Sequence, residues 1–126
     1  ILSCLPEFTQ AGAEAALDSD KDSIDKMNIE YAERMNILVN GLNKIPGISC
    51  VKPEGAFYIF PQIDKKLGDI KAYCNNLLLE EGVCVLPGEY FGKQGKNSVR
   101  LSYSTTTKEE IGIALEKINR FHLKSL

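Results

Sequence analysis

The sequence predicts an α+β fold in which helices cover a small mixed or antiparallel sheet that follows a long helix. Three patterns predict this fold. From Ser23 to Lys44, apolar residues recur at steps of three and four, as on one face of an amphipathic helix. Between Ile48 and Tyr103, short β-favouring runs lie on either side of one helical segment. A last helical pattern begins at Thr107, so the expected order is helix, strand, strand, helix, strand, strand, helix.

The composition is that of an ordinary globular domain. The chain has 126 residues, enough for one domain with one sizeable core, and its hydrophobic content of 44% is typical of soluble proteins. A net charge of −2 offers no basic surface, so neither nucleic acid nor an anionic membrane is an expected partner. No apolar run is long enough to span a bilayer, and no signal-peptide pattern opens the chain. The first residue is Ile1 rather than a methionine, which suggests a piece of a longer protein.

The cysteines point to a reducing, cytoplasmic setting. They form no CxxC pair and have no metal-ligand spacing, which argues against both a disulfide framework and a zinc site. Two of them lie in apolar segments, where a cysteine behaves as a small hydrophobic residue. We therefore expect free thiols at Cys4, Cys50, Cys74 and Cys84.

Two helices are expected before residue 47. The stretch from Thr9 to Leu17 is rich in strong helix formers, and Asp18-Ser19-Asp20 ends it. The long helix follows, with acidic residues at its start, where the helix dipole favours them, and Pro46-Gly47 at its end. Its apolar stripe predicts core packing, because three turns of near-heptad spacing are too few to indicate a coiled coil. The stripe comprises Ile24, Met27, Tyr31, Met35, Leu38, Leu42 and Ile45.

The remaining elements are delimited by local signals. Strands are expected at residues 48–51, 56–60, 83–86 and 99–103, with the last two paired. Asp69 is the expected N-cap of a helix over 70–81, and Gly82 is its expected left-handed C-terminal residue. The inner face of that helix is predicted to hold Ile70, Tyr73, Cys74, Leu77 and Leu78.

The last helix has a capping box at its start. Thr107 and Glu110 have the spacing in which each side chain bonds the other's backbone N–H. One side of this helix is apolar and is expected to face the core, through Ile111, Ala114, Leu115, Ile118 and Phe121.

One arginine is a candidate for ligand binding. On the predicted strand 99–103, apolar side chains point one way, while Arg100, Ser102 and Ser104 point the other way. A guanidinium has a planar fork of donors, which suits a carboxylate or a phosphate. The alternative is a solvated arginine on a half-exposed sheet, where most strand arginines lie.

For the other polar candidates, structural or surface roles are expected rather than catalytic ones. His122 is the only histidine and is expected at the surface near the C-terminus rather than in catalysis. The pairs Glu80-Glu81 and Glu109-Glu110 are typical of helix-surface charge. Ser102 and Ser104 have no evident base that would activate a nucleophile. We therefore expect no catalytic and no metal-binding residue in this chain.

The glycines and aromatic residues around residue 90 leave two possibilities open. Gly88, Gly92 and Gly95 do not match a phosphate-binding loop and are expected to form turns. Tyr58 and Phe91 are candidates to line a pocket, although core packing is the default for both.

Several short motifs together resemble a known family. Pro53-Glu54-Gly55-Ala56-Phe57-Tyr58 is followed by Gly82-Val83, Pro87-Gly88, Phe91-Gly92 and Val99-Arg100-Leu101-Ser102-Tyr103. In this order and spacing they resemble the C-terminal domain of class I aminotransferases, pyridoxal-phosphate enzymes of fold type I. Within that family, the resemblance is closest to the aspartate aminotransferase group. It covers essentially the whole chain, more loosely before Gly47.

The resemblance implies a function and a domain organisation. Residues 1–20 would be the end of the large cofactor domain, 21–46 the long interdomain helix, and 47–126 the C-terminal small domain. Arg100 would bind the α-carboxylate of an amino-acid substrate, with aspartate the expected one, and the amino group would pass to a 2-oxo acid. The parent enzyme would be a homodimer that uses pyridoxal 5′-phosphate.

The family's cofactor residues have no counterpart in this chain. Its cofactor lysine, the aspartate that pairs with the pyridine nitrogen and the aromatic residue on the cofactor ring lie upstream in the large domain. We therefore expect no cofactor-binding residue here, no pyridoxal phosphate bound to this chain alone, and no activity of the isolated chain.

Two other classes of function remain open. The chain could be a free-standing α+β module that binds a small anionic ligand through Arg100. It could also be a structural interaction domain that uses the apolar stripe between Ile24 and Ile45 as its contact surface. Within the family's fold, a decarboxylase or lyase is a further alternative.

Overall fold

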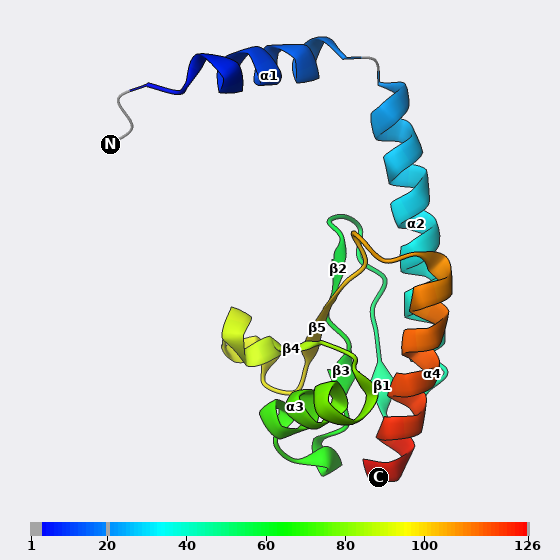
Figure 1. The fold of residues 1–126 in the computed structure, drawn as a ribbon. Helices are drawn as coiled ribbons and strands as arrows, with labels where there is room; N and C mark the ends of the chain where they lie inside the picture. Colours follow the sequence, from blue (N-terminus) through cyan, green and yellow to red (C-terminus); the bar gives the residue numbers. More distant parts are fainter. Residues whose placement is uncertain (1–3, 20, 126) are drawn as a thin grey trace.

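A computed structural model describes residues 4–19 and 21–125, and its architecture is α+β, as predicted (Figure 1). Asp20, expected at the end of the first helix, lies outside the described residues. The helices are α1 (Glu7–Asp18), α2 (Asp22–Leu42), α3 (Ile70–Glu81) and α4 (Lys108–Ser125). The strands are β1 (Ile48–Ser49), β2 (Tyr58–Ile59), β3 (Gln62–Ile63), β4 (Leu86–Pro87) and β5 (Val99–Ser102). Short 3₁₀ helices are η1 (Lys65–Leu67), η2 (Gly88–Phe91) and η3 (Lys93–Gly95).

The β-structure forms two small antiparallel sheets rather than one. β1 pairs with β3, with Ile48 opposite Ile63. The other sheet has the order β2-β5-β4, so the predicted pairing of the last two strands is confirmed. A bridge between Gln62 and Ser98 links β3 to the start of β5. The sequence did not predict β3, and the strand expected over 83–86 begins only at Leu86.

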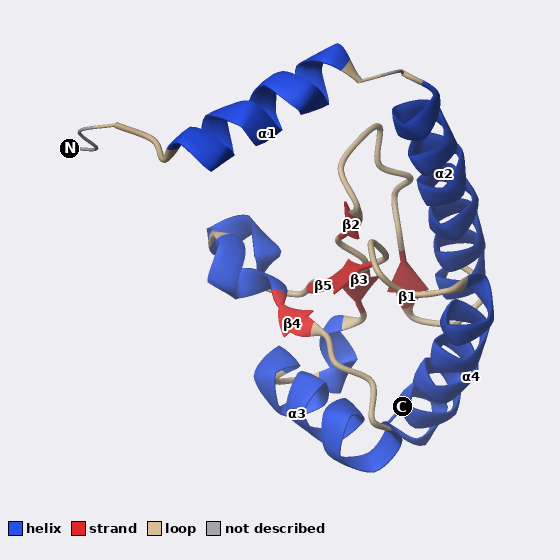
Figure 2. Cartoon of the chain, turned by 45° about the horizontal axis from the view of Figure 1, so that its top comes forward, coloured by secondary structure: helices blue, strands red, loops and turns tan. Residues whose placement is uncertain are grey.

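The core lies between the two sheets and helices α2, α3 and α4. α2 and α4 run side by side, and α3 packs against α4 and beside β4 (Figures 1 and 2). The lower half of the predicted stripe on α2 is buried, but Ile24 and Met27 are exposed because the upper half of α2 extends beyond the body. The innermost core side chains include Leu42, Ile59, Leu77, Val99 and Tyr103.

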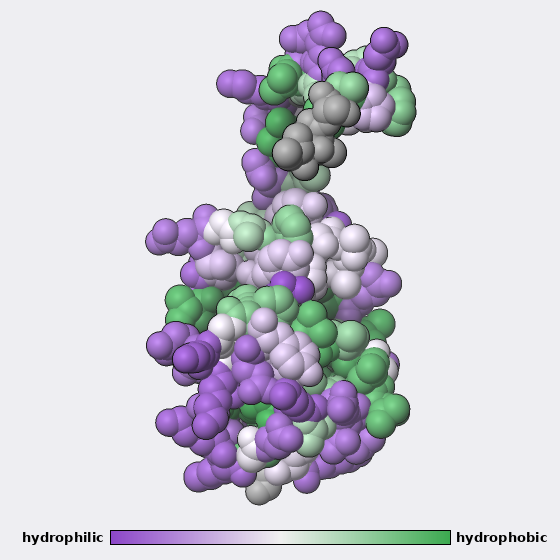
Figure 3. All heavy atoms as spheres, turned by 90° about the vertical axis from the view of Figure 1, so that its left-hand side faces the viewer, coloured by the Kyte–Doolittle hydropathy of each residue, from purple (hydrophilic) through white to green (hydrophobic). Residues whose placement is uncertain are grey.

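Helix α1 has no buried residue. It stands apart from the body as a separate lobe (Figure 3). Its apolar side chains Phe8 and Leu17 are almost fully exposed, as Leu5 just before it is in large part. No helix among the described residues is long and apolar enough to cross a membrane.

The predicted helix caps are confirmed. The Asp69 carboxylate accepts a hydrogen bond from the Lys71 backbone N–H at 2.9 Å, and Gly82 has a φ of 69° in the left-handed region. The Thr107 N–H donates to the Glu110 carboxylate at 2.8 Å, and the Glu110 N–H donates to Thr107 Oγ1 at 3.1 Å. The end of α2 was predicted too late. It lies at Leu42, where the following Asn43 side chain exchanges two hydrogen bonds with the Cys50 backbone.

Three predictions of exposure or burial were wrong. His122 is fully buried, not at the surface, and its Nδ1 lies 3.3 Å from the Tyr73 hydroxyl. Glu81 is buried rather than on the helix surface, and its carboxylate pairs with Arg120. Both differences arise because the last turns of α4 pack against α3 instead of fraying. Leu78, assigned to the inner face of α3, is exposed.

Because His122 is buried, we expect the free energy of unfolding to fall in mild acid. Burial lowers the pKa of His122, although the Pro46 backbone and, to a smaller extent, the nearby Asp64 carboxylate oppose part of this shift. Between that lowered pKa and the ordinary value, the unfolded chain binds a proton that the folded chain does not. The free energy of unfolding therefore rises with pH through this window, and this contribution of the histidine decreases as the pH falls below about 6.5.

We expect the free energy of unfolding to drop more in the wild-type chain than in His122→Gln between pH 7.5 and pH 5.5. Glutamine does not titrate, so the difference between the two slopes isolates the histidine. Urea denaturation followed by circular dichroism at both pH values measures it. Equal slopes would show that His122 does not contribute to the pH dependence.

Candidate functional site

Arg100 lies on β5, the middle strand of the three-stranded sheet. It is opposite Leu86 of β4, and the register Tyr58–Ser102 places Tyr58 of β2 diagonally across from it. The predicted alternation is confirmed, since Val99 and Leu101 are buried and Arg100 is half-buried on the other face. The two neighbouring strands therefore fix the backbone of Arg100, and with it the point from which its side chain starts.

Two aromatic rings contact the Arg100 guanidinium. Its Cζ lies 4.5 Å from the centroid of the Tyr58 ring and 3.9 Å from the centroid of the Phe91 ring, both cation–π distances. Phe91 is 46% exposed and Tyr58 is half-buried. Core packing, the default expectation for both residues, is therefore not their main environment.

Arg100 has no acidic partner within the part of the chain that the structure describes. The other two arginines do have one: Arg34 bonds the Glu30 carboxylate at 3.1 Å, and Arg120 Nε bonds Glu81 at 2.9 Å. No hydrogen bond from the Arg100 guanidinium to a described residue is present either. Its N–H groups can therefore donate hydrogen bonds to a carboxylate or phosphate of a ligand.

The hydroxyl groups near Arg100 do not form a nucleophilic site. Ser102 Oγ and Ser104 Oγ lie 3.1 Å apart and hydrogen-bond each other. The only histidine, His122, is buried against Tyr73 on the other side of the core. The site therefore provides charge and orientation, not a nucleophile or a base.

Three lysines among the described residues have polar partners. Lys71 pairs with Glu89 at 2.9 Å, and Lys108 pairs with Glu33. Hydrogen bonds and charges from these partners raise the pKa of both lysines. Lys117 donates to the Glu81 carbonyl at 2.7 Å, and the other lysines are exposed.

Among the described residues, the cysteines and acidic residues do not gather into a cluster that could hold a metal ion. Within residues 4–19 and 21–125, no group of three or more histidine, cysteine, aspartate or glutamate side chains is placed to hold an ion. The four cysteines are free thiols. Burial raises the pKa of Cys74 to about 11, which keeps this thiol protonated and unreactive.

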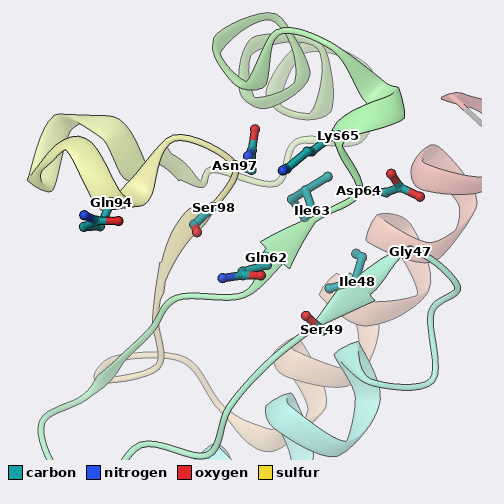
Figure 4. Close-up of a pocket in the computed structure, with 10 residues that line it drawn as sticks. All are labelled: Gly47, Ile48, Ser49, Gln62, Ile63, Asp64, Lys65, Gln94, Asn97 and Ser98. Atoms are coloured by element: carbon teal, nitrogen blue, oxygen red, sulfur yellow. The ribbon is translucent and has the colours of Figure 1, made fainter.

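Two surface hollows lie near β3 and the loop before β5. The larger, about 630 Å³, is lined by polar and apolar residues of β1, β3, η1 and η3 and of the loops beside them (Figure 4), and Arg100 does not line it. There Lys65 extends toward Asn97, whereas Asp64 points away. The smaller, about 400 Å³, lies beside Phe91 and therefore beside one of the rings that contact Arg100.

Comparison with known proteins identifies the family. The family model described as aminotransferase class I and II matches residues 1–118. The chain belongs to this family. A putative aminotransferase, YugH, from Bacillus subtilis is 37% identical over 95% of this chain and 31% of its own length. The aspartate aminotransferase of the same organism is 38% identical over 90% of this chain and 30% of its own length.

Solved aminotransferases share the fold. The aspartate aminotransferase from Rhizobium meliloti aligns with a TM-score of 0.86 and 33% identity, over 95% of this chain and 32% of that one. An aromatic aminotransferase from Pyrococcus horikoshii aligns with a TM-score of 0.85 and 36% identity, over 94% of this chain and 32% of that one. The chain thus spans about a third of the length of the aminotransferases it matches.

Proposed function

We propose that this chain is the C-terminal part of a pyridoxal-phosphate-dependent aminotransferase. The enzyme would move an amino group between an amino acid, aspartate in the first instance, and a 2-oxo acid. Arg100 would bind the α-carboxylate of the substrate. One observation carries the proposal: in a chain of this family, a strand arginine stacks on two rings and has no acidic partner among the described residues.

Arg100 contributes recognition and orientation. Two parallel N–H···O bonds to a carboxylate fix both the position and the plane of the substrate's carboxylate. Such a contact aims the amino group and the Cα–H at the cofactor, which converts binding into correct geometry for reaction. The cofactor supplies the electron sink for chemistry at Cα. The resemblance to the family implies that the covalent attachment of the cofactor would fall to the rest of the longer protein.

The domain organisation is part of the proposal. Residues 1–20 would end the large domain, 21–46 would form the interdomain helix, and 47–126 would form the small domain. The exposed apolar side chains Leu5, Phe8 and Leu17 support this division, because a large domain would cover them. The longer protein would be a homodimer in the cytoplasm, a setting that suits free thiols.

The same arginine also supports an alternative, a free-standing α+β module that binds a small anionic ligand. In both cases the guanidinium, which has no acidic partner among the described residues, donates hydrogen bonds to a carboxylate or phosphate. The two functions differ in the fate of the bound molecule. An aminotransferase changes its substrate, whereas a binding module releases the ligand unchanged.

An amino-transfer assay on the full-length protein tests the proposal. We expect turnover of aspartate with 2-oxoglutarate, with a kcat/KM of about 10⁴ M⁻¹s⁻¹ or more, typical of an enzyme acting on its own substrate. Alanine, phenylalanine and 2-aminoadipate in parallel define the specificity, and residues 1–126 alone should give no turnover. A full-length protein that binds these acids without producing the new amino acid would favour the binding module.

A further inference from the structure

We propose that Tyr58 and Phe91 are positioning residues that hold the Arg100 guanidinium in the orientation that receives a substrate carboxylate. This inference rests on the proposed function of Arg100 and adds to it. The two side chains would not touch the reacting atoms. They would act through the arginine, by stacking on it before the substrate arrives.

The distances define how the rings meet the guanidinium. The Cζ atom lies 3.9 Å from the centroid of the Phe91 ring, which is about one carbon–carbon van der Waals contact. An approach to the rim of the ring would leave the centroid farther away, so Cζ lies over the face of Phe91. At 4.5 Å, the Tyr58 ring is also within cation–π range.

Stacking immobilises an arginine without using its donors. The N–H groups of a guanidinium lie in its plane, whereas a ring stacked parallel to that plane would occupy its face and leave the donors accessible. An acidic partner would instead occupy donors and cancel the charge, as Glu81 does for Arg120 and Glu30 does for Arg34. Arg34 also lies over a ring, that of Tyr31 at 5.9 Å, but it pairs with Glu30. Arg100 instead lies over two rings and has no acidic partner among the described residues, so its donors are left for a ligand.

Each of the two rings is held by another ring. Phe91 meets Phe60 edge to face, with centroids 5.7 Å apart and an interplanar angle of 87°. Tyr58 meets Phe57 with centroids 4.5 Å apart. Nearly half of the Phe91 side chain remains exposed, so filling the core does not explain its place.

The loop that carries Phe91 is fastened to the strand that carries Arg100. Phe91 ends η2, whose first residue, Gly88, donates its N–H to the Ser98 carbonyl at 2.7 Å. Ser98 directly precedes β5. Phe91 therefore reaches the guanidinium from a backbone that is hydrogen-bonded at the base of the same strand.

This arrangement predicts a specific kinetic effect. A long side chain that is already ordered loses less conformational freedom when the ligand binds. Because the stacking is present before and after binding, its loss should weaken substrate binding more than it slows the chemical step. We expect Phe91→Leu to raise KM, and the inhibition constant of succinate, together by about 3- to 30-fold. The kcat should change by less than about threefold.

The experiment is a double-mutant cycle in the full-length, cofactor-loaded protein. The variants are Phe91→Leu, Arg100→Gln and the double variant, with Phe91→Tyr as the conservative replacement that keeps a ring. Tyr90→Leu is the matched control, because Tyr90 is an exposed neighbouring aromatic residue whose ring centroid lies 5.5 Å from Lys71 Nζ rather than beside Arg100. Melting temperature and cofactor absorbance are recorded for each variant.

If Phe91 acts through Arg100, its replacement by leucine weakens succinate binding in the wild-type background and has no effect in the Arg100→Gln background. Phe91→Tyr and Tyr90→Leu then stay close to wild type. If Phe91→Leu has no effect, or the same effect in both backgrounds, the positioning role is wrong while the role of Arg100 stands. If Arg100→Gln itself binds succinate and turns over substrate normally, the proposed function of Arg100 fails and the positioning role fails with it.

Discussion

Arg100→Lys in the full-length protein is expected to lower kcat/KM for the amino-acid substrate by about 100-fold or more, with the cofactor still bound. Lysine keeps the positive charge but is a point charge that cannot form two parallel hydrogen bonds to a carboxylate. It also cannot stack as a flat group on Tyr58 and Phe91, which contact the guanidinium at 4.5 and 3.9 Å. Loss of a desolvated, hydrogen-bonded charge pair typically costs about 2–5 kcal/mol, roughly 30- to 5,000-fold, and the expected change lies within this range.

Steady-state kinetics with varied substrate and absorbance of the bound cofactor together measure this outcome. Arg120→Lys is the matched control, because Arg120 is a helix-surface arginine whose partner is Glu81 rather than a ligand. It should leave kcat/KM within about threefold of wild type. Unchanged turnover in Arg100→Lys would show that the α-carboxylate is bound elsewhere.

The features that sequence predicted correctly depend on neighbours along the chain. The alternation around Arg100 placed it on the non-core face of its strand, since side chains on a strand alternate by geometry alone. The caps at Asp69 and Thr107 were predictable for the same reason, because capping joins residues two or three positions apart.

The features that sequence missed depend on which distant segments meet. Burial of His122 and Glu81 follows from the packing of α4 on α3, which no local pattern encodes. The stacking of Tyr58 and Phe91 on Arg100 requires the register of β2 against β5 and the path of the loop before β5. The sequence makes both rings candidates to line a pocket, but it does not show what they contact.

Gly95→Ala is expected to lower the free energy of unfolding by about 2–3 kcal/mol, within the usual range for overpacking. A Cβ atom at Gly95 would overlap the backbone carbonyl of Gly88, so the two 3₁₀ turns η2 and η3 could not keep their close approach. Backbone cannot move aside as the end of a flexible side chain can. The loop that carries Phe91 would have to shift, and with it the ring contact to Arg100.

Gly112→Ala is the matched control, with an expected effect of opposite sign. Gly112 lies inside α4, and a Cβ there meets nothing within 4 Å. Alanine in a helix interior is favoured over glycine by about 0.5–1 kcal/mol, so this variant should be slightly more stable than wild type. Denaturant unfolding of both variants compares one substitution in two backbone settings. If Gly95→Ala were as stable as Gly112→Ala, the η2–η3 contact would not constrain the loop, and Phe91 would owe its place to Phe60 and Arg100 alone.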